Sequence, residues 1–201
     1  MPLVQKADFF SAEDYLEWEK GNEIKHEYLN GEVFPMYETH AMAGAKDAHV
    51  TVALNIAALL KSHLRGGPCR VYMSDMKVRV ETANQFFYPD VLVTCDPSDR
   101  STDYFKSHPT LIIEVLSEST SAYDMGKKFR FYRHLDSLLE YVLVDPDRLG
   151  VDCFRRDADN HWVLHPFNAG DWVELAGVDF SAPIELFYED VAFPEKPTKP
   201  T

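Results

Sequence analysis

The sequence lacks several patterns that identify large classes of protein. Its three cysteines, Cys69, Cys95 and Cys153, are widely spaced and include no CxxC pair. Such spacing supports neither a zinc knuckle nor a disulfide framework. We therefore expect three reduced thiols in the core of a cytoplasmic protein. A Gly-rich phosphate loop and a nucleophile–histidine pair are also missing.

Long apolar runs are absent as well. No segment approaches the roughly 20 apolar residues that a membrane-spanning helix needs. The N-terminal stretch MPLVQKADFF has neither the basic region nor the apolar region of a signal peptide. We expect a protein that does not associate with membranes.

Basic charge is scarce. The chain has 20 Lys and Arg against 33 Asp and Glu, which gives a net charge of −13. Proteins attract nucleic acid non-specifically through Lys and Arg, so this balance disfavours such attraction. It leaves open a local basic site, a phosphate bridged by a metal ion, or a small substrate.

The order of the predicted elements indicates one α/β domain with a mixed sheet. Ser11 fits a helix N-cap, and Asn30-Gly31 fits a turn between extended segments. Residues 97–108 resemble a polar loop, and the segment from Asp171 onward is less regular. We expect a single domain over residues 1–192 and a frayed tail over 193–201. Apolar periodicity predicts helices over residues 11–20, 47–64 and 121–135, strands over 70–73, 76–81, 86–95, 111–116 and 138–145, and a hairpin from 150–156 and 161–165.

Two carboxylates interrupt apolar strands. Asp90 follows Pro89 in FFYPDVLVTC, and Glu114 lies inside LIIEVL. If the two strands are neighbours, strand alternation lets both acids converge on one face. Convergent carboxylates repel each other, and one would be protonated unless a cation were present. A divalent metal ion would supply that cation.

The predicted helix over 121–135 offers a further charged partner. At 100° per residue, one stripe holds Asp124, Lys128, Phe131, Tyr132 and Leu135. Because the apolar members should face the sheet, Lys128 should point inward, where Asp124 can pair with it at i, i+4. Two strand acids, a metal ion and an inward lysine suit the hydrolysis of a phosphodiester.

Each of these residues also has a purely structural interpretation. Glu114 could be a buried carboxylate paired with Lys128 or with a backbone donor. Asp90 could be a turn acid at the start of a strand, since Pro-Asp pairs are common in turns. Lys128 could instead bridge to Asp124 on a solvated face, and the adjacent Lys127 keeps the choice of lysine open.

The strings that carry these residues resemble the Uma2 family, also described as a domain of unknown function. This family belongs to the PD-(D/E)XK restriction-endonuclease-like superfamily. Its Pro-Asp, Glu-Val-Leu-Ser and Asp-x-x-x-Lys elements occur here in that order. The resemblance extends from about Ser11 to Tyr188, over the strings HEYLNGEVFPM, SDMKVRV, YPDVLVTC, PTLIIEVLSEST and DMGKKFRFYRHLDSLLEYVLVD.

The resemblance implies a restriction-endonuclease-like α/β fold: a mixed central sheet flanked by helices, with a β-rich C-terminal extension. Asp90 matches the acid of the Pro-Asp element, and Glu114 matches the acid of the (D/E)-x-K element. The lysine of that element would stand at position 116, which is Leu here. The resemblance places this lysine on the following helix, at Lys128.

The resemblance also implies an activity. We expect a divalent-metal-dependent endonuclease acting on DNA, with Asp90 and Glu114 as ligands of Mg²⁺ or Mn²⁺ and Lys128 assisting attack on phosphorus. An additional acid is expected from the first helix or the segment after it, with Glu27 as the first choice and Glu32 as the alternative. A homodimer is expected, because nucleases of this fold often cut two strands with two subunits.

Two other functions compete with this one, since a fold alone does not establish an activity. One is a catalytically weak or inactive module that keeps the fold and acts as a binding or assembly subunit. The other is a metal hydrolase with a different substrate. The net charge and the displaced lysine favour the first of these alternatives.

The remaining polar residues of interest are expected to be structural. His49 should cap the long helix or lie in the core, and His161 and His165 make a poor metal site on an exposed hairpin. Ser117, Ser119 and Thr120 should cap the helix that follows them, and its N-terminus could receive a phosphate.

Overall fold

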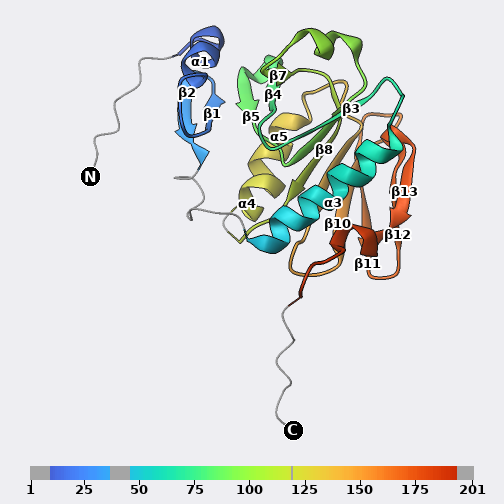
Figure 1. Ribbon diagram of the computed structural model, residues 1–201. Coiled ribbons are helices and arrows are strands. Elements are labelled where there is room, and N and C mark those ends of the chain that lie inside the picture. The colour runs from blue at the N-terminus through green and yellow to red at the C-terminus, as the bar shows by residue number, and fades with distance from the viewer. Residues whose placement is uncertain (1–9, 37–45, 119, 194–201) are drawn as a thin grey trace.

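A six-stranded mixed sheet forms the centre of the computed structural model, which describes residues 10–36, 46–118 and 120–193. Strands β8 and β9 are parallel, and the other neighbouring pairs of this sheet are antiparallel. Figure 1 shows the long helix α3 (Asp47–His63) across one face. The order of strands is β11 (Trp162–Asn168), β10 (Gly150–Arg156), β9 (Glu140–Val144), β8 (Pro109–Val115), β6 (Val91–Thr94) and β3 (Arg70–Met73).

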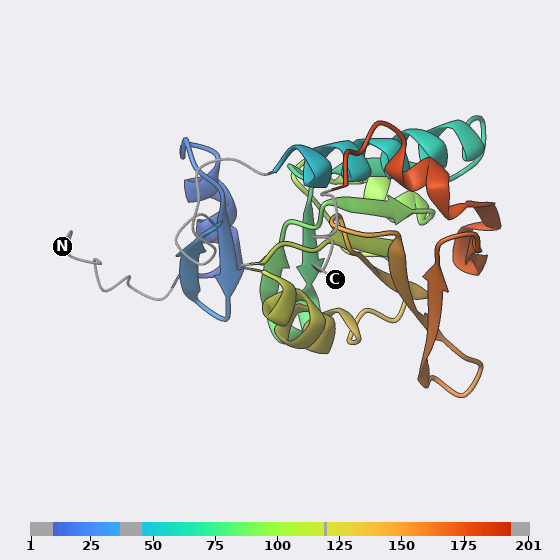
Figure 2. The same cartoon turned by 90° about the horizontal axis from the view of Figure 1, so that it is seen from below.

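The two faces of this sheet have different partners. Side chains at odd positions of β6 and β8, such as Val93 and Ile113, pack on α3 and on the C-terminal segment. Side chains at even positions, such as Leu92 and Ile112, pack beneath the helical segment 121–132. Figure 2 shows that segment and α3 on opposite sides of the sheet. Glu114 is at an even position of β8, so this alternation directs its side chain toward segment 121–132.

A second sheet joins the N-terminal segment to the core. It has five strands, and helix α1 (Ala12–Glu19) packs on its first hairpin with Ser11 as N-cap, as predicted. The predicted turn at Asn30-Gly31 is confirmed by their φ values of 50° and 98°. The order is β2 (Glu32–Pro35), β1 (His26–Leu29), β5 (Gln85–Phe87), β4 (Lys77–Val80) and β7 (Phe105–Lys106).

The single strand predicted over residues 86–95 is wrong. The structure divides it into β5 and β6, which belong to different sheets. Pro89 stands at the break, where its missing N–H and fixed φ disfavour continued strand pairing. Asp90 is therefore placed at the point where the chain passes from one sheet to the other.

The uniform helix predicted over residues 121–135 is also wrong. The segment consists of a short α4 (Ser121–Tyr123), a π-helical turn η3 (Asp124–Lys128) and α5 (Phe129–Tyr132). A π turn holds one extra residue, so the side chains that follow it are rotated relative to a continuous α-helix. Gly126 lies within the turn and has a low intrinsic preference for the α-helix. A local departure from α geometry at this position therefore loses less helix stability than it would at a strong helix former.

The C-terminal part is more regular than its sequence suggests. The predicted hairpin is confirmed as β10–β11. Beyond it, β12 (Trp172–Leu175), η4 (Ala176–Val178), β13 (Phe180–Pro183) and η5 (Ile184–Tyr188) form a second, β-rich unit against the sheet and α3. The expected polar loop over 97–108 contains η2 (Pro97–Ser101) and β7, and η1 (Glu81–Ala83) links β4 to β5. The tail predicted over 193–201 lies, except for Phe193, outside the described residues.

The expectation of three reduced thiols is corrected at two of them. Cys69 and Cys95 form a disulfide between the start of β3 and the end of β6, strands that pair side by side. Sequence spacing did not indicate this bond, because the two residues meet only through strand pairing. Cys153 is a free, buried thiol, as expected. None of the described helices combines the length and the hydrophobicity needed to span a bilayer.

Candidate active site

Asp90 lies directly before β6 and is fixed by the neighbouring strand. Its Oδ2 accepts a hydrogen bond from the backbone N–H of Val115, at 2.8 Å. Strand pairing explains this contact, because Val91 is opposite Ile113 in the antiparallel β6–β8 pair. The carboxylate thus adds one hydrogen bond to the β6–β8 ladder on the side of Asp90 that faces the break at Pro89. The two strands that carry Asp90 and Glu114 are neighbours, as the convergence of the two acids requires.

Glu114 lies near the end of β8 with only 2% of its surface exposed. Its Oε1 accepts hydrogen bonds from Nζ of Lys128 and from the hydroxyl of Tyr132, each at 3.2 Å. Burial raises the pKa of Tyr132 well above its ordinary value, and the charge of Glu114 adds to the effect. The tyrosine therefore keeps its proton and donates to the carboxylate.

Lys128 points into the protein, as predicted, and contacts three carboxylates. Its Nζ lies 3.0 Å from Oδ1 of Asp124, 3.2 Å from Oε1 of Glu114 and 3.9 Å from Oε1 of Glu27. The contact with Asp124 is an ion pair without hydrogen-bond alignment, since Oδ1 of Asp124 has no hydrogen-bond partner among the described residues. The π turn places both Asp124 and Lys128 on the buried side.

The structure separates the two candidates for the additional acid. Glu27, in β1, is buried and accepts a hydrogen bond of 2.7 Å from the hydroxyl of Tyr123. Glu32, in β2, is exposed and pairs with Leu29 across the hairpin. Only Glu27 joins the group around Lys128, and we call Glu27, Asp90, Glu114, Asp124 and Lys128 the acid–lysine cluster.

The acid–lysine cluster has more negative than positive charge. Burial raises the pKa of Glu114 well above its ordinary value, Asp124 and Asp90 raise it further, and Lys128 opposes them. Burial lowers the pKa of Lys128, but the nearby carboxylates outweigh it and hold the pKa well above its ordinary range. Four carboxyl groups share one ammonium ion, and another cation beside them would favour the ionised form of Glu114.

The donor atoms of this cluster fit a small, hard cation. Within residues 10–36, 46–118 and 120–193, no group of three or more His, Cys, Asp or Glu side chains is arranged to hold a metal ion by itself. Mg²⁺ needs no such cage, because it commonly uses one or two carboxylates with waters and substrate phosphates as its other ligands. Asp90 and Glu114 are the carboxylates of this cluster that would hold such an ion.

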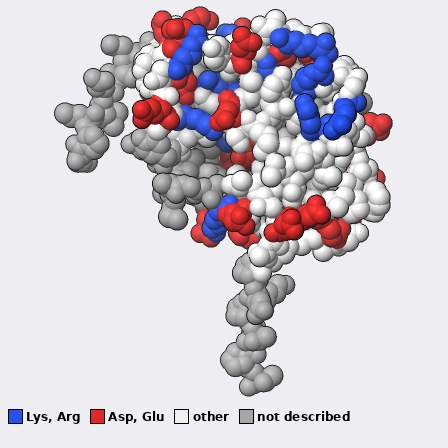
Figure 3. Space-filling view, viewed as in Figure 1, with Lys and Arg blue, Asp and Glu red and all other residues white. Residues whose placement is uncertain are grey.

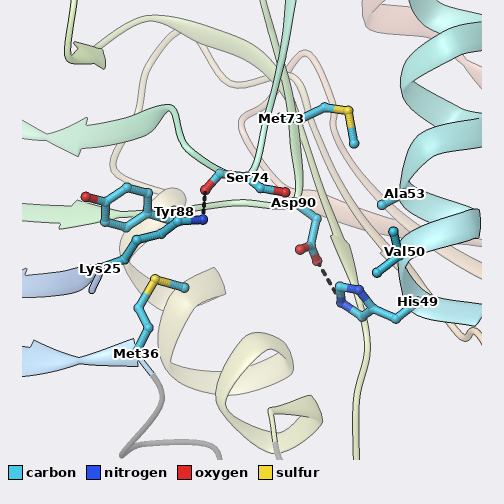
Figure 4. Close-up of a pocket in the computed structure, with 9 residues that line it drawn as sticks. All are labelled: Lys25, Met36, His49, Val50, Ala53, Met73, Ser74, Tyr88 and Asp90. Atoms are coloured by element: carbon cyan, nitrogen blue, oxygen red, sulfur yellow. Dashed lines mark hydrogen bonds and ion pairs between the residues drawn. The ribbon is translucent and has the colours of Figure 1, made fainter. Parts of the chain in front are cut away.

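A pocket of about 220 Å³ lies beside Asp90 and adds residues that sequence analysis did not assign to the site. Figure 4 shows the carboxylate of Asp90 turned toward the imidazole of His49, with Nε2 of His49 3.4 Å from Oδ2. On the other side, Nζ of Lys25 donates to the carbonyl of Ser74 at 3.2 Å, near the ring of Tyr88.

His49 is neither a helix cap nor an apolar core residue. It lies in the first turn of α3, whose N-cap position is Lys46. Burial lowers the pKa of His49, but the contact with Asp90 outweighs this and shifts the pKa upward. Only a weak sequence signal could have assigned His49 to the site. It is a polar residue in the first turn of a helix, and that helix packs beside the Pro89-Asp90 interruption between β5 and β6.

Other expected polar residues lie away from the cluster or support it locally. His161 is exposed on the β10–β11 turn, and Oδ2 of Asp157 is 3.3 Å from its Nδ1. Oγ of Ser117 accepts a hydrogen bond from the N–H of Thr120, but the N-cap of α4 is Thr120, whose side chain makes no capping hydrogen bond, so the expected capping by side chains is not found at these two residues. Ser119 lies outside the described residues.

Comparison with known proteins agrees with this architecture. Residues 12–185 match the model of the Uma2 family, whose description is "Putative restriction endonuclease". The uncharacterized protein slr1290 of Synechocystis sp. is 37% identical over 183 residues, which cover 91% of this chain and 93% of that protein. A second Synechocystis protein, the uncharacterized sll1609, is 31% identical over 167 residues, covering 82% and 90%.

A solved structure supports the fold independently. The crystal structure of a protein from Anabaena variabilis, described as "a putative nuclease belonging to DUF820", superimposes with a TM-score of 0.68. The superposition covers 90% of this chain and 98% of that one, at 16% sequence identity. This likeness establishes the restriction-endonuclease-like α/β fold. Since the family model spans most of the sequence, the chain belongs to the Uma2 family.

Proposed function

We propose that this protein is a divalent-metal-dependent endonuclease that hydrolyses phosphodiester bonds in DNA. The observation that carries the proposal is the joint placement of Asp90, Glu114 and Lys128. Asp90 stands directly before β6 and Glu114 lies in the neighbouring β8, and Lys128 reaches Glu114 at 3.2 Å from the facing turn. Burying charged groups is costly, so a functional reason for the arrangement is favoured over a purely structural one.

Asp90 and Glu114 would hold Mg²⁺ or Mn²⁺, with water and phosphate oxygens completing the coordination. The bound ion would supply Lewis acidity and a water of lowered pKa. The chain's own groups orient the two ligands. The N–H of Val115 and the imidazole of His49 fix Asp90, and the hydroxyl of Tyr132 fixes Glu114.

Lys128 would stabilise the negative charge that develops on the phosphoryl oxygens. Its ammonium is held by Asp124 and Glu27, so it stays charged and positioned while substrate binds. In the reaction, the oxygen of water bonds to phosphorus as the bond from phosphorus to the leaving sugar oxygen breaks. A preorganised ammonium in a buried site contributes more to this step than one in water.

Calorimetric titration of Mn²⁺ tests the metal site without any assumption about substrate. Wild type should show saturable binding that is lost in Asp90→Asn and in Glu114→Gln, whereas Glu32→Gln, a neutralised exposed acid, should bind as wild type does. A second titration in the presence of a phosphorothioate DNA duplex covers the case in which phosphate oxygens are needed as ligands. Lack of binding in both titrations would contradict the proposal.

Plasmid nicking tests the reaction itself. With Mg²⁺ or Mn²⁺, wild type should convert supercoiled DNA to open-circular or linear products. Lys128→Met should reduce the rate by about 10²–10³-fold, the usual effect of removing one electrostatic stabiliser. Metal binding without cleavage of single- or double-stranded DNA or RNA would instead favour a non-catalytic nuclease-fold module.

A further inference from the structure

The outer surface of the helical segment that carries Lys128 is basic. Lys127, Arg130 and Arg133 are exposed, whereas Lys128 between them is buried. No Asp or Glu occurs from Lys127 to Leu135. In a chain with a net charge of −13, we call these three exposed cations the basic ridge.

The cations of the basic ridge have no carboxylate partners within the ranges that the structure describes. There, none of Lys127, Arg130 and Arg133 lies within 4.0 Å of an Asp or Glu oxygen. Other exposed cations do have such partners; examples are the pairs Lys20–Glu17, Lys46–Glu118 and Arg148–Asp145. The ridge therefore has positive charge that internal ion pairs do not neutralise.

Aromatic rings support two members of the ridge instead. Nζ of Lys127 lies 5.5 Å from the ring centre of Tyr123, whose hydroxyl bonds Glu27 of the acid–lysine cluster. The guanidinium of Arg133 lies 5.4 Å from the ring centre of Phe129. Cation–π contacts position a charge without neutralising it, so both groups remain available to an anion.

The spacing of the ridge suits a nucleic-acid strand. At about 1.5 Å of rise per residue, Lys127 and Arg133 are separated by roughly 9 Å along the helical axis. Successive phosphates of one DNA strand advance by about 3.4 Å along the duplex axis. The three cations therefore extend over two to three phosphates.

We propose that Lys127, Arg130 and Arg133 bind the phosphate backbone of duplex DNA whose phosphodiester enters the acid–lysine cluster. The inference rests on the proposed function and adds to it the surface that holds the substrate. It also explains how an acidic protein would bind DNA: the favourable charge is local, on the same helical segment as Lys128. Contacts of this kind position the duplex without reading its sequence.

A second basic group supplies a matched control. Lys61, Arg65, Arg70 and Arg100 are exposed near the far end of α3, where Figure 3 shows Lys and Arg side chains gathered. Lys61 is about 18 Å along α3 from His49, by the rise of a helix. Arg100 donates to the carbonyl of Pro68. Removing three charges there alters the net charge as much as removing the ridge does.

The experiment measures binding of a fluorescent 20-base-pair duplex by anisotropy, in EDTA to prevent cleavage, over a series of NaCl concentrations. The ridge variant is Lys127→Gln/Arg130→Gln/Arg133→Gln, and the control is Lys61→Gln/Arg65→Gln/Arg100→Gln. The ridge variant should bind at least 10-fold more weakly, and its log–log salt slope should fall by about 2–3, roughly 0.9 per lost phosphate contact. The control should bind within about threefold of wild type.

Several outcomes would overturn the inference. Equal losses in the two variants would mean that net charge, rather than the ridge, governs binding. An unchanged salt slope in the ridge variant would show that the ridge makes no phosphate contacts. Binding only to single-stranded DNA or to an acidic protein would show that duplex DNA is not the ligand of the ridge. If wild type nicks plasmid and the ridge variant binds and nicks equally well, the inference fails while the proposed function stands. If wild type neither binds nor nicks DNA, both fail.

Discussion

The ammonium of Lys128 meets the carboxylate of Glu114 at 3.2 Å, although a helical turn carries the lysine and a strand carries the acid. The position two residues after Glu114, where the (D/E)-x-K pattern would place the lysine, holds Leu116, which packs in the apolar cluster on the same side of the sheet. The distance between lysine and acid therefore depends on how segment 121–132 docks on the sheet. A substitution at Lys128 or Glu114 therefore tests the packing of this segment as well as the charge of the pair.

Lys128→Met should lower the free energy of unfolding by about 3–5 kcal/mol, because it leaves several buried carboxylates without a cation. Urea denaturation at neutral pH in the absence of metal measures the change. Lys127→Met is the matched control: it alters the adjacent exposed lysine and should stay within about 0.5 kcal/mol of wild type. Similar losses in both variants would show that the turn, rather than the buried charge, sets stability.

Glu114→Gln should change how stability depends on pH. Burial raises the folded-state pKa of Glu114, with Asp124 and Asp90 adding to the effect and Lys128 opposing it. An unfolded glutamate titrates near pH 4.3, so above that pH the folded state keeps a proton that the unfolded state releases. This component of stability therefore decreases as pH rises from the unfolded toward the folded pKa.

Glutamine removes that component, so the stability of Glu114→Gln relative to wild type should increase from pH 4.5 to pH 8. Metal-free urea denaturation at several pH values tests the trend, with Glu32→Gln as an exposed control that should show none. A difference between variant and wild type that is constant with pH would contradict the raised pKa.

Glu140 should be important for stability at a distance from the site. It is fully buried in β9, and its oxygens accept hydrogen bonds from Nε of Arg155 at 2.7 Å and from the N–H groups of Ala176 and Gly177 at 3.1 and 2.9 Å. Glu140→Ala leaves a charge and two backbone donors without their acceptor, so we expect a loss of about 3–5 kcal/mol. Thermal and urea denaturation measure it. The exposed Glu189→Ala should have little effect, and comparable stability of both variants would refute the role of Glu140.

The cysteines allow a count of reactive thiols. Burial raises the pKa of Cys153 to about 12, with Glu140 adding to the effect, so its thiol should react very slowly with a thiol reagent in the native protein. After denaturation without reductant, one thiol should react, because Cys69 and Cys95 are bonded to each other. Denaturation with reductant should expose three. Three reactive thiols without reductant would show that the disulfide does not form in solution.

Much of the arrangement around Asp90 and Glu114 could be predicted from local patterns. Glu114 interrupts an apolar strand, and strand alternation places it on a definite face. The inward direction of Lys128 also followed from the apolar members of its stripe. These inferences succeeded because a residue's parity in a strand and its direction on a helix are fixed by near neighbours.

The remaining features depend on contacts between distant segments. A 3.6-residue period cannot reveal the π turn at Asp124–Lys128, since its extra residue is accommodated by packing. The sequence made Glu27 the first choice and kept Glu32 as the alternative, and the contacts of Glu27 with the hydroxyl of Tyr123 and the ammonium of Lys128 distinguish the two. The contact of His49 with Asp90 requires the docking of α3, and the Cys69–Cys95 bond requires the pairing of β3 with β6.

The contact between Glu27 and Lys128 has a consequence for synthesis of the chain. The two residues are about 100 positions apart, and the acid is made first. At ribosomal rates of roughly 5–20 residues per second, Lys128 is synthesised on the order of 5–20 s after Glu27. During that interval its hairpin cannot bury the carboxylate without an unpaired charge. The N-terminal segment should therefore stay open on the ribosome until the turn that carries Lys128 has emerged, which happens only after more than half of the 201 residues have been made.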